Sequence, residues 1–375
     1  MDTKIIAYYL PQFHQVKEND EWWGEGFTEW TNVKKAVPLF KGHYQPVVPL
    51  GGNYYDLLDI DTVKWQTEIA VSHGIYGFAY YHYWYVGRKI LEKPAENLLG
   101  WKNINQRFFF FWANHTWFKG VKGKKTILIE QTYGGRTDWI EHYLYMKPFF
   151  VDDRYIKVSN MPIMGIYMPK DIPDFDEMVE VWNCLARKDG FDGVYIIESL
   201  NKSTDLIIGR HTNAGVIRQP NVSKGEYMFP SNKGASFVFR AIRKAKWLVF
   251  QKGMFFKYDF AKIMKYESEE DLGHYRTKNE TIYYGISVGW DNTPRHGKYG
   301  QVMVNATPEN FRLGFEKLYS RSCKEGKEFI FINAWNEWAE GMYLEPDERY
   351  GYEFLDVIKD VKESTCEKKL LSEAR

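Results

Sequence analysis

Glu328–Gly341 reads E-F-I-F-I-N-A-W-N-E-W-A-E-G. The apolar run in this stretch leads without a break into amides, tryptophans and two glutamates, Glu337 and Glu340. Core strands do not normally end in this way, whereas sugar sites combine indole faces that stack on pyranose rings with carboxylates that move protons. We therefore predict a buried strand that ends at a carbohydrate site. The alternative is a strand end followed by solvated acids.

Other apolar stretches precede this one along the chain, and segments of helical character separate most of them. The full set of expected strands is Ile5–Leu10, Gly77–Trp84, Arg107–Asn114, Pro162–Met168, Gly193–Leu200, Asn213–Arg218, Ile282–Asp291 and Glu328–Trp335. Continuously apolar strands with helices between them are typical of a parallel sheet that helices cover. Eight such units favour a (β/α)₈ barrel over a doubly wound sheet.

Polar and aromatic residues gather at the C-terminal ends of the first, second, third, seventh and eighth of these strands. A barrel brings those ends together on one face, where its active sites lie. No linker, repeat or low-complexity tract interrupts the units. We predict an α/β fold, a single (β/α)₈ TIM barrel with long βα loops over residues 1–375, with a core at about 4–356 and a C-terminal helix and tail at 352–375.

A helix is predicted at Asp61–His73, with Asp61 as its N-cap and Gly74 as its stop. D-x-D sequences at Asp59–Asp61 and Asp174–Asp176 have the form that metal-dependent nucleotide-sugar transferases use. Each directly precedes a predicted helix, where aspartate caps the first turn, so we assign both to capping. The sequence accordingly predicts no metal site and no cofactor.

The 375-residue chain carries 50 Lys and Arg against 49 Asp and Glu, a formal net charge of +1. This balance gives no support to nucleic acid or to an anionic membrane as a partner. Aromatic residues make up 18% of the chain, and stacking on sugars needs flat faces that an ordinary core does not need. The composition favours an oligo- or polysaccharide, free or lipid-linked, as the partner.

The three cysteines, Cys184, Cys323 and Cys366, are far apart and form no C-x-x-C pair. They support neither a disulfide framework nor a zinc site. The N-terminal sequence M-D-T-K-I-I-A-Y-Y-L lacks the regions of a signal peptide, and no apolar run approaches the roughly 20 residues of a membrane span. We expect a cytoplasmic protein with reduced thiols.

Long motifs spread over the chain carry a resemblance to a known family. They are Y-Y-L-P-Q-F-H at Tyr8–His14, E-W-W-G-E-G-F-T-E-W-T-N-V at Glu21–Val33, H-Y-Q-P at His43–Pro46, Y-Y-H-Y-W at Tyr80–Trp84, G-W-D-N-T-P-R at Gly289–Arg295 and N-A-W-N-E-W-A-E-G-M-Y-L-E-P-D at Asn333–Asp347. From about Lys4 to Asp356 the chain resembles the WbsX-type proteins, which are encoded with bacterial O-antigen and capsule assembly genes and are often labelled glycosyltransferases. These proteins are similar to glycoside hydrolase family 99, the endo-α-mannosidases, which are TIM barrels.

The resemblance implies a retaining reaction through a 1,2-anhydro sugar. Glu337 would take the proton of the sugar 2-hydroxyl, and Glu340 would protonate the leaving oxygen and then activate water. Glu340 must hold a proton at neutral pH, and we expect Trp338 and Glu337 to provide the apolar and anionic setting that this requires. Positions three apart on a regular strand face opposite sides, so the chain must leave strand geometry at or after Glu337.

Other residues at these strand ends and in these loops are predicted to contact the substrate. They are Tyr8, His14, Trp30, His82, Trp84, Trp112, Asn114, His115, Trp117, Trp290, Asp291, Trp335, Asn336, Trp338 and Glu345. Packing on the barrel is the alternative for His82, Trp84 and the first loop, and loop capping is the alternative for Asp291. His115 stands where the family commonly has an acid, which indicates a different or a charged sugar next to the reacting bond.

Two charged residues lie in predicted strands. For Arg218 we predict an internal salt bridge, with an acidic sugar as the alternative partner. Glu198 lies in an apolar run, where a buried carboxylate needs a partner, so it is either functional or salt-bridged.

The basic-aromatic segment 240–265 places Lys and Arg around Trp and Phe. We assign it to a helix that covers the barrel with a solvated basic face. Peripheral contact with a membrane is the less favoured alternative.

These observations predict a carbohydrate-active enzyme of bacterial surface polysaccharide metabolism. The leading hypothesis is a retaining, endo-glycosidase-like cleavage of an α-mannoside-type linkage in O-antigen or capsule. A glycosyltransferase of O-antigen or capsule biosynthesis and a non-catalytic glycan-binding barrel are the alternatives. The sequence contains none of the motifs of metalloproteases, dinucleotide-binding proteins or serine hydrolases.

Overall fold

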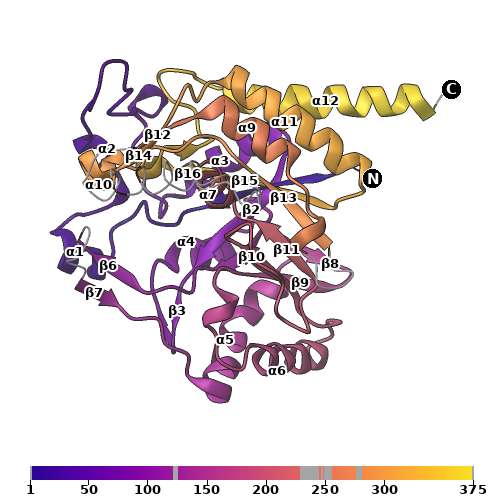
Figure 1. The fold of residues 1–375 in the computed structure, drawn as a ribbon. Coiled ribbons are helices and arrows are strands. Elements are labelled where there is room, and N and C mark those ends of the chain that lie inside the picture. The colour runs from indigo at the N-terminus through magenta and orange to yellow at the C-terminus, as the bar shows by residue number, and fades with distance from the viewer. Residues whose placement is uncertain are drawn as a thin grey trace.

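The computed structural model describes residues 2–120, 126–228, 245, 248, 256–275 and 281–373. Eight parallel strands close into a barrel in the order in which they occur along the chain (Figure 1). They are β1 (Lys4–Tyr9), β2 (Ile75–His82), β5 (Phe108–Trp112), β9 (Met161–Ile166), β10 (Tyr195–Leu200), β11 (Ala214–Ile217), β13 (Thr281–Ser287) and β15 (Phe329–Asn333). The pairing of β15 with β1 closes the ring, with Ala7 opposite Ile332. The predicted (β/α)₈ barrel is confirmed.

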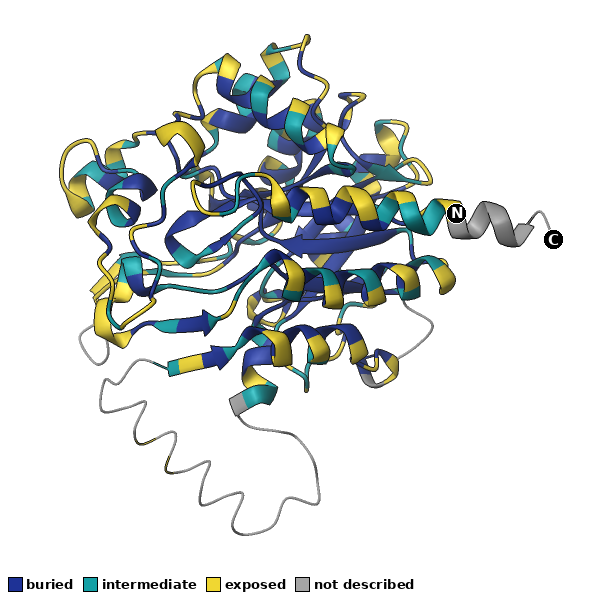
Figure 2. Ribbon diagram, turned by 90° about the horizontal axis from the view of Figure 1, so that it is seen from above, coloured by how far each residue is buried: buried dark blue, intermediate teal, exposed yellow. Residues whose placement is uncertain are grey.

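Helices surround the barrel and connect most of its strands (Figure 1). They are α3 (Ile60–Ser72), α4 (Lys93–Gly100), α5 (Gly135–Phe150), α6 (Phe175–Lys188), α9 (Phe260–Glu269), α11 (Pro308–Lys324) and α12 (Glu353–Glu373). Figure 2 shows buried strands at the centre and outer helices that combine a buried face with an exposed one. Residues 201–213, between β10 and β11, contain no helix, so one of the units lacks its outer layer.

Long loops leave the C-terminal ends of the strands and carry small elements of their own. These are α1 (Lys17–Trp23), α2 (Glu29–Lys35), η1 (Leu50–Gly52), β3 (Trp84–Tyr85), β4 (Arg88–Lys89), β6 (Trp117–Lys119), β7 (Thr126–Ile129), η2 (Pro169–Asp171), α7 (Asn221–Met228), β12 (Phe256–Asp259), α10 (Thr293–His296), η4 (Gly297–Tyr299), β14 (Gln301–Val304), β16 (Asn336–Glu337), η5 (Trp338–Glu340) and β17 (Met342–Tyr343). Two further elements, β8 (Lys157–Val158) and η3 (Gly273–Tyr275), precede barrel strands. The long βα loops thus stand over one end of the barrel, as expected.

Large aromatic side chains fill the barrel interior. The rings of Phe111 and Phe331 lie around Tyr8 at centroid distances of 5.2 and 5.7 Å. Gly165 makes room for this layer, because a side-chain carbon added there would overlap the Phe111 ring. The interior is a packed core up to the level of Tyr8, so a substrate site has space only beyond it, at the C-terminal ends of the strands.

The aspartates of the D-x-D sequences behave differently from the prediction. Asp59, and not Asp61, caps α3, because its side chain accepts a hydrogen bond from the backbone N–H of Asp61. Asp174 precedes α6 with a φ of 52°, and its side chain caps nothing. Asp176 instead accepts hydrogen bonds from the backbone N–H and Nε of Arg210, at 2.6 and 2.9 Å. Capping of a helix N-terminus therefore explains the D-x-D sequence at Asp59–Asp61 but not the one at Asp174–Asp176.

Within the described residues, no helix is both long and apolar enough to cross a bilayer. Most of the basic-aromatic segment 240–265 lies outside the described residues, apart from Ala245, Leu248 and the portion that begins at Phe256. The described portion enters α9, which packs against α11 on the outside of the barrel.

Candidate active site

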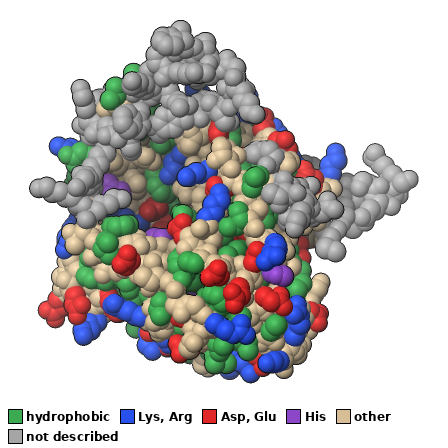
Figure 3. All heavy atoms as spheres, turned by 60° about the horizontal axis from the view of Figure 1, so that its bottom comes forward, with side chains coloured by type: hydrophobic (Ala, Val, Ile, Leu, Met, Phe, Trp, Pro, Cys, Tyr) green, Lys and Arg blue, Asp and Glu red, His purple; other side chains and the backbone are tan. Residues whose placement is uncertain are grey.

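A cavity of about 730 Å³ opens at the C-terminal ends of the barrel strands. The ends of β2, β9 and β11 contribute Tyr81, Tyr167 and Arg218 to its wall, and loops contribute Glu29, Arg295, Glu337 and Glu340. Figure 3 shows a hollow in the surface in which histidine and acidic side chains lie together. The space is large enough for sugar residues and is walled by aromatic and charged groups.

The turn after β16 brings Glu337 and Glu340 into the same cavity. β16 ends at Glu337, the chain tightens into the 3-10 turn η5, and Gly341 follows with a φ of 61°. In such a turn, side chains three positions apart no longer point to opposite faces. The departure from strand geometry that the two-carboxylate role requires is therefore present.

Replacing Gly341 by alanine should destabilise the protein and displace Glu340. An added methyl carbon would lie 2.7 Å from both Cβ and backbone N of Asp291, in a backbone conformation that side chains rarely adopt. We expect the free energy of unfolding in a urea titration to fall by about 2 kcal/mol. Gly351→Ala is the matched control, because its φ of 52° is similar but nothing lies within 4 Å. Equal losses in both variants would contradict the clash at Gly341.

Arg295, from the short helix α10, joins three carboxylates in the cavity. Its Nη1 donates to Glu340 Oε1 at 2.5 Å, and its Nη2 and Nε donate to Glu29 Oε2 at 3.0 and 3.1 Å. Nη2 also lies 3.7 Å from Glu337 Oε2. One positive charge faces three carboxyl groups, which favours the retention of a proton among them.

Glu337 is buried, and its Oε2 forms no hydrogen bond with any residue that the structure describes. Burial and then the neighbouring charge of Glu340 raise the pKa of Glu337 to about 8, while Arg295 limits the rise. A carboxyl group with an unused oxygen and a raised pKa is a strong base once it has lost its proton. The geometry therefore suits removal of a proton from a sugar hydroxyl.

The setting of Glu340 differs from the prediction. Trp338, which was expected beside it, stacks on Tyr343 at a centroid distance of 3.9 Å and donates its indole N–H to Glu345. Arg295 stands next to Glu340 instead, and protonation of Glu340 breaks this ion pair. The physical reason is the tight turn, which directs neighbouring side chains to different sides of the loop.

His115 and Trp117 are the predicted substrate-contacting residues that lie in the cavity wall. His115 is exposed toward the open cavity, and the protein packed around its ring lowers its pKa. Its ring meets Tyr167 edge-on at 5.6 Å. A neutral imidazole can both donate and accept a hydrogen bond, as contact with a sugar hydroxyl requires.

His82, Trp84 and Trp112 lie outside the barrel and not in the cavity. His82 Nε2 is 2.8 Å from Nε2 of His142 on α5, and the ring of Trp84 stacks on the same histidine at 4.5 Å. Trp112 meets it edge-on at 4.8 Å. Because side chains alternate along a strand, Tyr81 faces the cavity and His82 faces the helix. These three residues pack between barrel and helix, which corrects the prediction of substrate contact.

Glu345 and Asn336 hold the turn in place and do not reach the cavity. Glu345 accepts hydrogen bonds from Tyr55 Oη at 2.7 Å and Gln66 Nε2 at 2.6 Å. Burial raises the pKa of Glu345 to about 7, although these donors oppose the rise. The Asn336 amide bonds both the N–H and the C=O of Leu10, at 2.7 and 3.0 Å. Both residues position the site and do not line it.

Trp30, Trp335 and Trp338 are buried among other aromatic side chains. Trp30 lies 5.5 Å from Trp338, and Trp335 lies 5.2 Å from Phe78. These three tryptophans pack the first and last loops against the barrel. This packing role takes the place of the predicted contact with substrate. Their faces are already occupied, which leaves none free for a sugar ring.

Tyr8, His14 and Asn114 are also buried and lie outside the cavity wall. The ring of Tyr8 lies beneath the guanidinium of Arg218. Nδ1 of His14 lies 3.0 Å from a neighbouring backbone carbonyl oxygen. Asn114 bonds both the N–H and the C=O of Met168, at 2.8 and 2.9 Å, which joins the loops after β5 and β9. These three residues therefore support the surrounding structure, in place of the predicted contact with substrate.

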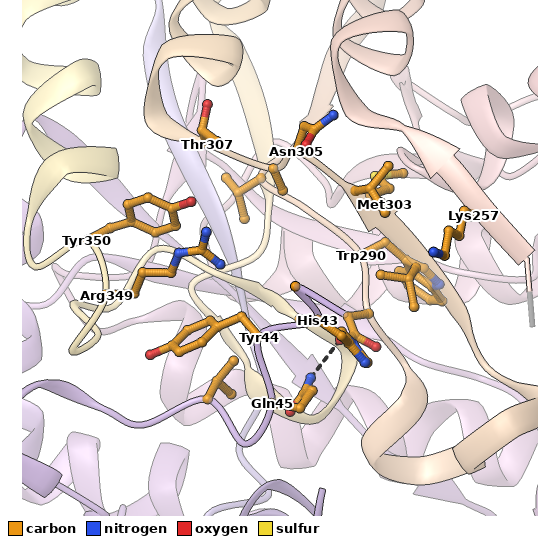
Figure 4. Close-up of a pocket in the computed structure, with 18 of the residues that line it drawn as sticks. His43, Tyr44, Gln45, Lys257, Trp290, Met303, Asn305, Thr307, Arg349 and Tyr350 are labelled. Atoms are coloured by element: carbon orange, nitrogen blue, oxygen red, sulfur yellow. Dashed lines mark hydrogen bonds and ion pairs between the residues drawn. The ribbon is translucent and has the colours of Figure 1, made fainter. Parts of the chain in front are cut away.

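Trp290 and Asp291 line a second, smaller cavity of about 450 Å³ (Figure 4). His43 Nε2 and Gln45 Nε2 lie 2.7 and 2.6 Å from one carboxylate oxygen of Asp291. The other oxygen accepts from the backbone N–H of Thr293 at 3.0 Å, at the start of α10. Loop capping, the alternative for Asp291, describes its observed bonds.

Glu29, Tyr81, Tyr83 and Arg295 also line the cavity, and all four lie in the motifs that carry the family resemblance. For the first loop, which contains Glu29, the sequence left a lid or wall of the site and packing on the barrel as alternatives, and Glu29 lies in the wall. Strand alternation was available as a signal for the two tyrosines, since residues two apart share one face. No local signal pairs Glu29 with Arg295, which meet through the tertiary fold.

Glu198 forms no salt bridge with a described residue and does not line the cavity. Its carboxylate accepts hydrogen bonds from the backbone N–H groups of Ile208 and Gly209 and from Thr212 Oγ1, at 3.0, 2.8 and 2.5 Å. Burial raises the pKa of Glu198 despite these donors. Glu198 stabilises the helix-free connection between β10 and β11. Both predicted roles, a functional residue and a salt-bridged one, are therefore corrected.

The predicted salt bridge of Arg218 does not form with any described residue. Its guanidinium lies over the ring of Tyr8, with 3.9 Å from Cζ to the ring centroid, and donates to Tyr81 Oη. The group belongs to the cavity wall.

The closed (β/α)₈ barrel, with two glutamates in a cavity at the C-terminal strand ends, has the fold of solved glycoside hydrolase structures. Similar solved structures include the GH99 endo-α-mannosidase from Bacteroides thetaiotaomicron in complex with bis-tris-propane, with a TM-score of 0.57 and 12% identity over 99% of both chains. Another structure of that GH99 endo-α-mannosidase has a TM-score of 0.56 and 14% identity over 98% of this chain and 99% of the other. A glycoside hydrolase-like protein matches with a TM-score of 0.54 and 13% identity, over 96% of this chain and 94% of the other. At these identities the likeness concerns the fold.

The chain belongs to the WbsX glycosyltransferase family, whose sequence model matches residues 5–358. It is 30% identical over 372 residues to the uncharacterized protein WxcX of Xanthomonas campestris pv. campestris strain B100, covering 96% of this chain and 49% of that protein. WxcX of strain ATCC 33913 matches to the same extent. The chain thus spans about half the length of these curated relatives.

Proposed function

We propose that this protein is a retaining endo-glycosidase that cleaves an α-mannoside-type linkage in a bacterial surface polysaccharide, an O-antigen or a capsule. The observation that carries the proposal is that Glu337 and Glu340 line one cavity, with Arg295 next to both. Trp117, which is partly exposed in the same wall, offers an aromatic face for a pyranose ring. The GH99-type fold supports the class of reaction.

In the proposed first step, Glu337 removes the proton of the sugar 2-hydroxyl. Oxygen O2 then bonds to the anomeric carbon, and the bond from that carbon to the glycosidic oxygen breaks. Glu340 gives its proton to the departing oxygen. In the second step Glu340 takes a proton from water, the water oxygen opens the 1,2-anhydro ring, and Glu337 returns its proton to O2. Two inversions at the anomeric carbon give net retention.

The electrostatics provide the number of protons that this mechanism needs. Because burial raises the pKa of Glu337 to about 8, this carboxyl group holds a proton near neutral pH. The reaction requires that proton on Glu340. A 2-hydroxyl that donates a hydrogen bond to Glu337 favours its ionised form, so substrate binding moves the proton to the acid.

Incubation with the surface polysaccharide of the source strain tests the proposal directly. New reducing ends should appear, and proton NMR should show the α-anomer as the first product. An analogue that lacks the 2-hydroxyl should not be cleaved, because it lacks the nucleophile. Cleavage of that analogue at a similar rate would rule out the 1,2-anhydro route, and a β-anomer as first product would rule out retention.

The rate constant kcat/KM should fall as pH rises above about pH 8. The reaction needs the one proton that the free enzyme holds on Glu337, and burial raises the pKa of that group to about 8, so above this value the proton is lost and activity falls about tenfold per pH unit. Glu29→Gln should move this decline to lower pH, because it removes a nearby negative charge and leaves Arg295 free to face Glu337. Activity that stays constant above pH 8, or a decline that Glu29→Gln does not move, would contradict Glu337 as the source of the proton.

The family description favours glycosyl transfer as a second candidate. The same cavity would serve it if the hydroxyl of an acceptor sugar, in place of water, opened the 1,2-anhydro ring. A transferase must bind a donor sugar, so calorimetric titration with nucleotide-linked and lipid-linked sugars separates the two. Transfer requires measurable affinity for one donor, whereas hydrolysis requires none.

A further inference from the structure

Arg218 is a charged residue of the cavity that the proposed reaction leaves unused. Its side chain is 7% exposed and forms part of the cavity wall. The guanidinium lies among three tyrosines, 3.9 Å from the ring centroid of Tyr8, 5.3 Å from that of Tyr81 and 5.7 Å from that of Tyr167. Nη2 donates to Tyr81 Oη, whereas Nη1 is buried and has no hydrogen-bond partner in the described part of the chain.

Among the described residues, no carboxylate forms an ion pair with Arg218, in contrast to Arg295, which faces three. Burial of a cation without a counter-ion is unfavourable, and aromatic faces offset a part of that cost. Arg218 is therefore a buried cation that no described carboxylate pairs directly, and it lies close enough to Glu337 for its charge to lower the pKa of that group.

We propose that Arg218 binds an anionic group of the substrate, the carboxylate of a uronic acid in the polysaccharide. One unpaired positive charge matches a monoanion. A dianionic phosphate monoester would leave excess negative charge near Glu337 and Glu340. Because Arg218 shares the cavity with both glutamates, the charged sugar lies at or next to the reacting position. The inference rests on the proposed function only in taking the cavity as a sugar site.

His115 and Tyr167 provide the remaining polar groups on this side of the cavity. Their rings meet edge-on at 5.6 Å, next to the guanidinium of Arg218. The imidazole and the phenol can donate hydrogen bonds to the second carboxylate oxygen or to an adjacent hydroxyl. The surroundings thus suit a carboxylate that is attached to a pyranose.

The test compares matched ligands by isothermal titration calorimetry in the Glu340→Gln background, so that turnover does not interfere. The probes are the methyl α-glycosides of mannuronic, glucuronic and galacturonic acid and their three neutral hexose counterparts. At least one uronate should bind about tenfold or more tightly than its neutral partner, as a hydrogen bond to a charged group predicts. A 6-O-sulfated hexoside forms a further arm, and an equal Arg218-dependent preference for it would support monoanion binding in general.

Arg218→Met should abolish the preference for the anion, and Arg218→Lys should retain a part of it. Arg136→Met, on the exposed face of α5, should leave it unchanged. Thermal unfolding provides an independent readout, because removal of an uncompensated buried charge should leave the Tm of Arg218→Met equal or higher. No preference for any anionic probe, or a preference that survives Arg218→Met, would overturn the inference. Absence of hydrolysis with the preference intact would count against the proposed function alone.

Discussion

Glu337→Gln and Glu340→Gln should each lower kcat for polysaccharide cleavage by about a thousandfold, with KM changed only a few-fold. Glutamine keeps the shape of the side chain but can neither remove nor supply a proton, and general acid–base catalysis contributes about 10²- to 10⁴-fold. Both carboxyl groups line the cavity, and neither carries a structural hydrogen bond to the barrel core. Reducing-end release at saturating and limiting substrate separates kcat from KM.

The two variants should differ when the leaving group is activated. The fluoride ion of a glycosyl fluoride leaves without a proton. The first step should therefore recover in Glu340→Gln and produce a burst. Glu337→Gln should not recover, because it still lacks the base that creates the nucleophile. Glu68→Gln, on the exposed face of α3, is the control and should behave as the parent protein. Full activity in either variant would refute the assignment, and equal recovery of both with the fluoride would refute the separate roles.

Arg295→Met should lower the free energy of unfolding by about 3 kcal/mol at pH 8. The change leaves Glu29, Glu337 and Glu340 close together without their shared cation. The folded pKa of Glu337, which burial already raises, then rises further, so the deficit is small below about pH 3, where this carboxyl group is protonated in both the folded and the unfolded state. The deficit grows as pH rises and the folded protein must ionise Glu337 beside the other two carboxylates. Urea titrations across this range measure the trend.

A second substitution identifies the cause of that loss. Glu29→Gln in the Arg295→Met background should recover about 1 to 2 kcal/mol, because it removes one of the repelling charges, and the two effects should not be additive. Arg312→Met, which breaks an exposed pair with Asp360, should cost less than about 1 kcal/mol. A loss in Arg295→Met that does not vary with pH would show that packing, and not charge, is responsible.

The strand residues that the sequence placed near a substrate illustrate why part of the site was predictable. His115 and Trp117 follow the end of β5 and reach the cavity, as strand-end position alone implies. His82 also ends a strand, yet it faces α5 and pairs with His142. Strand ends show where a site lies, but the face that each residue presents depends on which side of the strand turns toward the helices. Because side chains alternate along the strand, Tyr81 faces the cavity and the next residue, His82, does not.

The sequence by itself determined the barrel and the position of the carboxylate pair, because continuous apolar strands, helix periodicity and the turn at Gly341 are local properties of the chain. Only the tertiary structure decided what surrounds that pair. Arg295 meets Glu29 across 266 positions, and Arg218 meets Tyr81 across 137. A charge interacts through space, so its partners follow from which segments the closed barrel brings together and not from their order along the chain.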